Sequence, residues 1–394
     1  MQNDPVVIVG MARTPIGKLL GELKSFSANE LGAHAISAAI SRANLTPVDI
    51  HEVLMGCVLP AGQGQAPARQ AAIKAGIPYS TPCTTLNKVC GSGMKAVMFA
   101  HDMIKCGTND VIVAGGMESM TNAPYMLLKA RQGYRLGHGE LVDHMMLDGL
   151  EDAYEKGQAM GVFAERTVKD YGLSRKQLDD YALSSFERAQ HAIRTKLFAA
   201  EIAPLTLQTK QGETMIENDE HPFSVNPEKI PQLNAAFAKD GTITAGNSSS
   251  IADGAAALVL MRLSEAEKRG LKPLAKIVGI SAHAKAPGEF STAPIDAIKK
   301  LMQQLNWTIN DVDLFEINEA FAVVVLAAMK DLNIPREKVN IHGGAVALGH
   351  PIGASGARIL VTLISALQQS KLKRGIASLC IGGGEATAVA IEMI

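Results

Sequence analysis

The chain has 394 residues, of which 47% are hydrophobic and 20% charged, and its 38 basic residues balance 39 acidic ones. This length predicts one large compact unit or two fused ones, and the near-zero net charge gives no overall field that would attract nucleic acid or an anionic membrane. Aromatic side chains make up only 4% of the chain, which also disfavours a base-stacking surface. No apolar run reaches the roughly 20 residues that span a bilayer, so we expect no membrane partner.

The first predicted element is a strand at Val6–Val9, which follows the opening letters MQNDP directly. A cleaved leader would need a basic start and an apolar stretch, so we expect none. The ten histidines form no HExxH motif and no short Cys/His cluster, so we predict no metal site. An odd number of cysteines without a CxxC pair predicts free thiols in a cytoplasmic protein. These cysteines are Cys57, Cys83, Cys90, Cys106 and Cys380.

Two distant segments of the chain repeat one pattern. One reads TPVDIHEVLMG and the other TINDVDLFEIN, with Asp49 over Asp311. Further on, Ser92 falls against Ser355, and each serine begins a helix that leads through a polar turn into an apolar strand and a Gly-Gly pair followed by an acid. A run of matching segments in one order indicates the duplication and fusion of one strand-helix fold.

The repeat divides the chain into parts. The second copy opens at Leu274 with LAKIVGISA, which resembles the first opening, VVIVGMARTP. Short Val/Ile/Leu strands alternate with helices in both copies, which predicts α/β layers with mostly buried sheets. We predict an amino-terminal half at 1–120, a loop-rich insertion that covers the site at 121–250, a return segment at 251–269 and a carboxy-terminal half at 270–394.

The segment NKVCGSGMKAV places Cys90 immediately before a predicted helix at 94–104. This helix and its counterpart at 359–367 carry apolar residues on more than one face, so we expect both to be buried against each other. A helix amino terminus stabilises a thiolate, and Gly91 and Gly93 would leave room for a ligand to approach the backbone. An isolated cysteine can equally be a small buried hydrophobe, so its position alone leaves both interpretations open.

Two further segments supply partners for this cysteine. GGAVALGHPIGASGAR holds His350 in a glycine-rich loop before the duplicate helix, and SLCIGGGEA ends a strand with Cys380. By themselves, the histidine can be a turn residue and the cysteine a core residue beside a tight turn. The repeat, however, places all three side chains at strand ends or loops that flank equivalent helices. Together they would supply a nucleophile, its base and a second acid–base thiol, beside glycine amides that could bind an oxyanion.

Four segments in this order, NKVCGSGMKA, NEAFA from Asn318, GGAVALGHPIGASGAR and CIGGGEA, resemble the thiolase family along the whole chain, most closely its acetyl-CoA acetyltransferase branch. The resemblance implies a thiolase-like duplicated α/β/α/β/α fold with two mixed sheets and buried central helices. It also implies a reversible Claisen condensation of two acetyl-CoA to acetoacetyl-CoA and CoA through an acetyl-cysteine. The substrates would be CoA thioesters, and no cofactor would be needed.

The family's reaction assigns a role to each matching residue. In thiolases the cysteine matching Cys90 carries the acyl group, the histidine matching His350 activates that thiol, and the cysteine matching Cys380 removes an α-proton from the second acetyl-CoA. The enolate oxygen is stabilised by the same histidine and by a water held by the asparagine matching Asn318. Backbone amides matching Cys90 and Gly382 serve the tetrahedral intermediate.

The resemblance also implies which residues line the path of CoA. These are Leu150, Met160, Ala245, Ser249, Ile251, Ala320 and Phe321, although apolar positions of this kind can also be ordinary packing. The chain departs from the family at Ala159, where many relatives have His, and at Phe223, where many have an Arg that contacts the adenine end of CoA. We therefore expect other groups to hold the nucleotide end, or a weaker hold on it.

The motif CGSG and the segment KAPGEFSTAP resemble short-chain enzymes, which favours acetyl-CoA and acetoacetyl-CoA as substrates. The alternatives are a longer-chain 3-ketoacyl-CoA thiolase of fatty-acid oxidation and a non-catalytic thiolase-like protein that binds acyl-CoA or lipid. A decarboxylating ketoacyl synthase would need a His-His-Cys or His-Asn-Cys set, which the chain lacks. The family further implies a homotetramer, a dimer of dimers, with its tetramer contact around MTNAPYMLLKARQGYRLGHGE.

Overall fold

The computed structural model describes residues 4–210 and 212–394. Residues 1–3, which belong to the opening segment for which we expect no leader, lie outside the described residues. Ten strands form one mixed sheet, whose main path runs β12-β13-β14-β11-β1-β10-β5-β3-β4, with β2 paired to β10. These strands are β1 (Val6–Arg13), β2 (Gly17–Lys18), β3 (Glu52–Gly56), β4 (Cys83–Leu86), β5 (Val111–Ser119), β10 (Ala252–Arg262), β11 (Ala275–Ala284), β12 (Leu314–Ile317), β13 (Arg374–Ile381) and β14 (Glu385–Met393).

The strand pairing confirms the predicted duplication. In the first copy β3 is parallel to β5, which pairs antiparallel with β10, which pairs antiparallel with β1. In the second copy β12, β13, β14 and β11 repeat these relations in the same order. The two copies meet where β1 pairs with β11 over only two residue pairs. The two predicted mixed sheets are therefore joined edge to edge into one hydrogen-bonded path.

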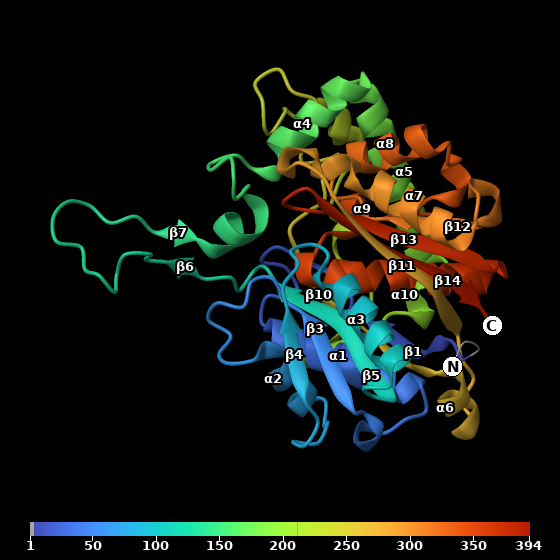
Figure 1. Ribbon diagram of the computed structural model, residues 1–394. Coiled ribbons are helices and arrows are strands. Elements are labelled where there is room, and N and C mark those ends of the chain that lie inside the picture. Colours follow the sequence, from blue (N-terminus) through green and yellow to red (C-terminus); the bar gives the residue numbers. More distant parts are fainter. Residues whose placement is uncertain (1–3, 211) are drawn as a thin grey trace.

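Ten α-helices occur in the described residues, and they cover the strands in layers (Figure 1). The core divides into α1 and α2 on the first half-sheet, α3 and α10 between the half-sheets, and α7 and α8 on the second half-sheet. This is the predicted α/β/α/β/α order. The helices are α1 (Ala28–Arg42), α2 (Pro67–Lys74), α3 (Ser92–Cys106), α4 (Met160–Tyr171), α5 (Arg175–Arg194), α6 (Leu263–Lys268), α7 (Ala293–Leu305), α8 (Ala322–Leu332), α9 (Ala345–Leu348) and α10 (Ile352–Ser370).

The central helices α3 and α10 pack on each other, as the sequence predicts, because small residues bring their starts together. A Cβ atom built on Gly93 would lie 2.9 Å from the backbone nitrogen of Ala357, and one on Gly356 would lie 2.5 Å from that of Met94. Matching serines stabilise both starts, since Ser92 Oγ donates to Val89 O and Ser355 Oγ donates to Pro351 O. The structure thus places the two helix amino termini close to one another in the middle of the molecule.

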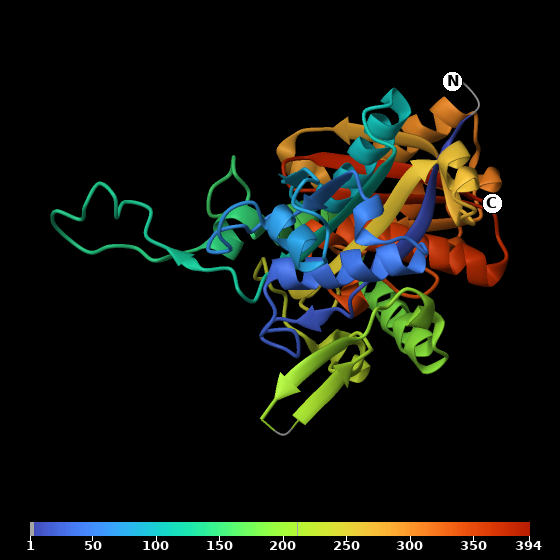
Figure 2. The same cartoon turned by 90° about the horizontal axis from the view of Figure 1, so that it is seen from below.

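The insertion between the copies contributes α4, α5 and two hairpins. One hairpin pairs β8 (Leu205–Thr209) with β9 (Gly212–Ile216). The other pairs β6 (Tyr125–Met126) with β7 (Val142–Asp143), and its tip extends far from the body as a long arm (Figures 1 and 2). No helix within residues 4–210 and 212–394 is long and apolar enough to cross a membrane. The four-part division of the chain stays a prediction.

Candidate active site

Cys90 lies in the turn between β4 and α3, where Gly91 caps the helix. The preceding residue, Val89, has φ +46°, a left-handed conformation that is strained for a β-branched side chain. A hydrogen bond of 2.9 Å from Val89 N to Asn87 Oδ1 holds this turn. The backbone therefore fixes the thiol beside the positive end of a long helix.

The prediction that Gly91 and Gly93 leave room for a ligand to approach the backbone is wrong. A Cβ on Gly91 would collide with the side chain of Ile381, and one on Gly93 would press against the backbone of α10. Both glycines allow close packing between the two copies of the fold. A ligand would reach the Cys90 thiol through the cavity that Cys90 lines, and neither Gly91 nor Gly93 is in the wall of that cavity.

His350 lies in the loop before α10, and its tautomer follows from its neighbours. Its Nδ1 is 2.6 Å from Ser355 Oγ, and that hydroxyl donates its single proton to Pro351 O at 2.9 Å. The serine oxygen must then accept from Nδ1–H, which leaves Nε2 as an unprotonated acceptor. Burial, reinforced by the positive charge of Arg358, lowers the pKa of His350 to about 3. The ring is neutral at physiological pH and can accept a proton at Nε2.

Asn318 follows β12 and is almost fully buried beside this ring. Its Nδ2 lies 3.4 Å from His350 Nε2, while Arg358 Nη2 donates to its Oδ1 at 3.4 Å. The guanidinium thus selects the amide orientation, because only the oxygen can accept from it. The amide NH₂ therefore faces the histidine.

The second thiol, Cys380, is the penultimate residue of β13, and Gly382 follows it in the next turn. Burial raises the pKa of Cys380 well above its usual range, and the nearby Cys90 adds to this effect. Burial also raises the pKa of Cys90 to about 11, against the opposing effect of the backbone amides of Gly382 and Cys90 itself. Both thiols are therefore protonated at rest, and a neutral histidine is the base that chemistry here requires.

A cavity of about 460 Å³ brings the predicted residues together. Cys90, His350, Cys380 and Gly382 line it, whereas Asn318 is not in its wall but contacts His350 Nε2. All of the predicted CoA-path residues are in its wall: Leu150, Met160, Ala245, Ser249, Ile251, Ala320 and Phe321. The structure thus brings these side chains to one site, while their individual roles stay predictions.

The sequence reasoning missed several residues of this wall. Phe237 and Phe290 both stack edge-on against Phe321, with ring centroids 6.1 and 6.3 Å away. His221, Met146 and Ile352 are also among the missed residues. They come from loops, short turns or a helix start, and although Phe290 and Ile352 lie in the segments KAPGEFSTAP and GGAVALGHPIGASGAR, nothing in the sequence marked their side chains as part of the cavity wall.

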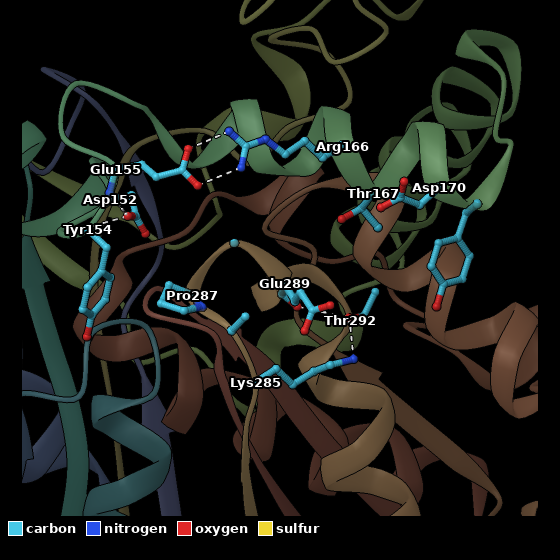
Figure 3. A pocket seen from close by; sticks show the side chains of 13 residues that line it. Asp152, Tyr154, Glu155, Arg166, Thr167, Asp170, Lys285, Pro287, Glu289 and Thr292 are labelled. Carbon is cyan, nitrogen blue, oxygen red and sulfur yellow. Dashed lines mark hydrogen bonds and ion pairs between the residues drawn. The ribbon is translucent and has the colours of Figure 1, made fainter.

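A larger cavity, of about 530 Å³, lies nearby but has a different character (Figure 3). Its wall includes the Arg166 side chain, which makes a two-pronged contact with Glu155 at 2.9 and 2.7 Å, and Lys285. It contains no cysteine or histidine among the described residues that line it. The smaller cavity is therefore the candidate active site. In the part of the chain that the structure describes, no three His, Cys, Asp or Glu side chains form a group that could hold a metal ion.

Two thiols and a neutral histidine in one cavity, at the meeting point of a duplicated α/β fold, define a thiol-dependent acyl-transferring enzyme. Residues 6–264 match the family model "Thiolase, N-terminal domain" and residues 271–393 match "Thiolase, C-terminal domain". The chain belongs to the thiolase family.

Relatives and a solved structure agree with this assignment. Acetyl-CoA acetyltransferase 1 of Arabidopsis thaliana is 50% identical over 100% of this chain and 95% of its own. The mitochondrial acetyl-CoA acetyltransferase of Mus musculus is 48% identical over 99% of this chain and 92% of its own. The crystal structure of the Bacillus anthracis acetyl-CoA acetyltransferase superposes with a TM-score of 0.96 and 42% identity, covering 99% of each chain.

Proposed function

We propose that the chain is an acetyl-CoA acetyltransferase, which condenses two acetyl-CoA to acetoacetyl-CoA and CoA and catalyses the reverse thiolysis. The observation that carries this proposal is the cavity in which Cys90, neutral His350 and Cys380 meet. Near-full-length identity of about half the residues with relatives named for this activity supports the substrate class. Steady-state thiolysis of C4, C6 and C10 3-ketoacyl-CoAs tests it, with C4 expected to be the best substrate.

In the first half-reaction, His350 Nε2 takes the proton of Cys90 as the thiolate attacks the acetyl-CoA carbonyl. The oxyanion that forms is stabilised by the amides of Cys90 and Gly382, the groups that already favour the thiolate. The carbon–sulfur bond to CoA then breaks, and the departing CoA thiolate takes the proton of Cys380. This half-reaction leaves acetyl-Cys90, a Cys380 thiolate and a protonated histidine.

In the second half-reaction, the Cys380 thiolate removes an α-proton from a second acetyl-CoA. The carbanion attacks acetyl-Cys90, whose sulfur leaves and recovers its proton from His350. All three side chains return to their starting protonation states, so the cycle balances without an added group. We therefore propose that no resident metal or cofactor takes part, and activity that disappears on dialysis against a divalent-metal chelator would contradict this.

Chain length is expected to depend on Phe290, which lies in the short 3-10 helix η6 (Pro287–Thr292). Its ring is in the wall of the candidate active site, while its neighbours Gly288 and Glu289 line the larger cavity on the other side. Phe290→Leu should raise the ratio of kcat/KM for C6 over C4 thiolysis by about tenfold, because it removes ring atoms from the cavity wall. Phe163→Leu, the same change in a buried ring outside the cavity wall, should leave the ratio unchanged. An unchanged ratio for Phe290→Leu would show that this part of the wall does not limit the chain length of the substrate.

The nucleotide end of CoA is expected to be held by groups other than the family's arginine. Phe223 is half-exposed and follows His221 of the cavity wall by two residues. The Arg194 guanidinium lies 5.4 Å from the centroid of the Phe223 ring. We propose that this pair supplies the missing flat, positively charged surface. Phe223→Arg should then change the KM for acetyl-CoA while leaving kcat close to that of the wild type. An unchanged KM would argue against a nucleotide contact here.

We propose a homotetramer, a dimer of dimers, with the β6–β7 arm as the tetramer contact. Large apolar side chains on this arm are exposed, and a cluster of this kind on a projecting hairpin is typical of a protein interface. They are Tyr125, Leu127, Leu128, Tyr134, Leu136 and Leu141. Light scattering coupled to gel filtration tests the assembly, and a monomer would contradict it. A cytoplasmic location, which five free thiols favour, is likewise a proposal that cell fractionation tests.

A further inference from the structure

Glu118 is a buried acid that the reaction scheme does not use, and it is the acid that follows the Gly-Gly pair of the first copy. It has no exposed surface. Its Oε2 accepts hydrogen bonds from Val58 N at 3.0 Å and Gly353 N at 2.8 Å. Its Oε1 accepts from Leu59 N at 3.1 Å and contacts the Cys57 thiol at 3.6 Å. One carboxylate thus ties the end of β5 to two other segments.

One of these segments carries the base. Gly353 is the second residue of α10 and lies three positions after His350. A Cβ on Gly353 would lie 2.5 Å from Glu118 Oε2 and 2.9 Å from Met117 O, so only glycine leaves room for the carboxylate. The positive end of α10 favours a negative group at this place. Glu118 therefore fixes the start of the helix that follows the histidine loop.

The other segment leads to the nucleophile. Val58 donates its N–H to Glu118, and its carbonyl accepts from Asn87 Nδ2 at 3.4 Å. Asn87 Oδ1 in turn accepts from Val89 N at 2.9 Å, one residue before Cys90. A continuous path of hydrogen bonds thus runs from the start of α10 through Glu118 to the strained turn of the nucleophile. It crosses the boundary between the two copies of the fold.

We propose that Glu118 is a positioning residue of the reaction, which holds the loop of His350 and the turn of Cys90 in register across the two halves. This inference rests on the proposed function, because it assigns these two residues to one reaction. The repeat gives the arrangement a simple origin. Ser92 corresponds to Ser355, so Gly353 occupies the position that Cys90 has in the first copy. The start of α3 therefore carries a thiol at this position, whereas the start of α10 carries a glycine whose N–H donates to the Glu118 carboxylate.

The charge of Glu118 has a second, separable effect. Burial raises the pKa of Glu118 to about 7, although hydrogen bonds from three backbone amides act to lower it. The negative charge of Glu118 in turn raises the pKa of Cys90. The titratable groups that face it are the Cys57 thiol after β3 and the Cys90 thiol before α3, and His350 lies in the loop before α10. Loss of the charge should therefore favour the Cys90 thiolate in the resting enzyme, even where loss of the hydrogen bonds impairs turnover.

Glu118→Gln tests both effects with opposite signs. An amide cannot accept at both ends, so kcat for acetoacetyl-CoA thiolysis should fall about 100-fold while KM stays close to that of the wild type. In the substrate-free protein, the rate of Cys90 alkylation by iodoacetamide should reach a given value at lower pH. Glu201→Gln is the matched control, since Glu201 is also fully buried but contacts Arg13 and Thr362. It should leave both readouts unchanged.

Asn87→Ala is the second variant, because Asn87 is exposed and its loss threatens the fold less. It cuts the same path without removing a charge, so kcat should fall while the alkylation profile stays in place. A wild-type kcat in Asn87→Ala, or in folded Glu118→Gln, would overturn the inference, as would an equal loss in Glu201→Gln. Absence of thiolysis in the wild type would instead reject the proposed function, whereas an alkylation profile unchanged by Glu118→Gln would reject the charge effect alone.

Discussion

Cys90→Ala is expected to lower the rate of acetoacetyl-CoA thiolysis by about four orders of magnitude or more. Alanine keeps the turn and the helix start but removes the sulfur that would carry the acetyl group. The other thiol in the cavity, Cys380, lies in β13 and not at a helix start. It cannot take over the nucleophile's position in the turn before α3, beside the Gly382 amide. Steady-state rates measured on the C4 substrate check this result.

The matched control is Cys106→Ala. Cys106 is the last residue of α3 and is exposed, so the two cysteines mark opposite ends of one helix. We expect Cys106→Ala to retain wild-type thiolysis, which would show that the loss in Cys90→Ala comes from the site and not from altered packing of α3. Thiolysis retained in Cys90→Ala would reject the acyl-cysteine route.

Cys380→Ala is expected to separate the two half-reactions. The variant should lose condensation by about 10³-fold, because the thiolate proposed to take the α-proton is gone. Acetyl transfer to Cys90 should persist, since the nucleophile, its base and the Gly382 amide are still present, and the departing CoA thiolate can take back from His350 the proton that Cys380 would have supplied. A burst of CoA release equal to one per site, without further turnover, is the expected time course after mixing with acetyl-CoA.

Solvent isotope exchange gives the decisive readout for this variant. Wild-type protein in deuterated water should exchange the α-protons of acetyl-CoA, as followed by NMR, and Cys380→Ala should not. Exchange at the wild-type rate in Cys380→Ala would show that another group is the base for the α-proton. Loss of the CoA burst would instead indicate that Cys380 is needed for acylation.

The sequence predicted the parts of the site that depend on local chemistry and on the repeat. Cys90 and His350 each precede a helix start marked by a serine, and the repeat indicated that the two helices lie together. Alternating strands and helices in both copies predicted α/β layers, and the family resemblance implied their α/β/α/β/α order. The edge-to-edge union of the half-sheets was not predicted, because it rests on two residue pairs between β1 and β11 that carry no sequence signal.

Residues whose position depends on distant packing escaped prediction. Phe290 lies in the segment KAPGEFSTAP, which was interpreted as a short-chain signal, but it reaches the cavity through a short turn without a periodic pattern that would show where its ring points. Glu118 was visible as the acid of a repeated motif, but its partner Gly353 is 235 residues away. Gly91 was noticed for the wrong reason, because the Ile381 side chain that excludes a Cβ there belongs to the other half of the fold.

Cys90 is proposed to carry the acetyl group between two CoA thioesters. Peptide mass spectrometry of the protein after brief incubation with acetoacetyl-CoA and rapid acid quenching tests it most directly. We predict the added mass of one acetyl group on the peptide that contains Cys90, and its loss when CoA is added before quenching. An unmodified Cys90 peptide, or acetyl on Cys380 in its place, would contradict the account.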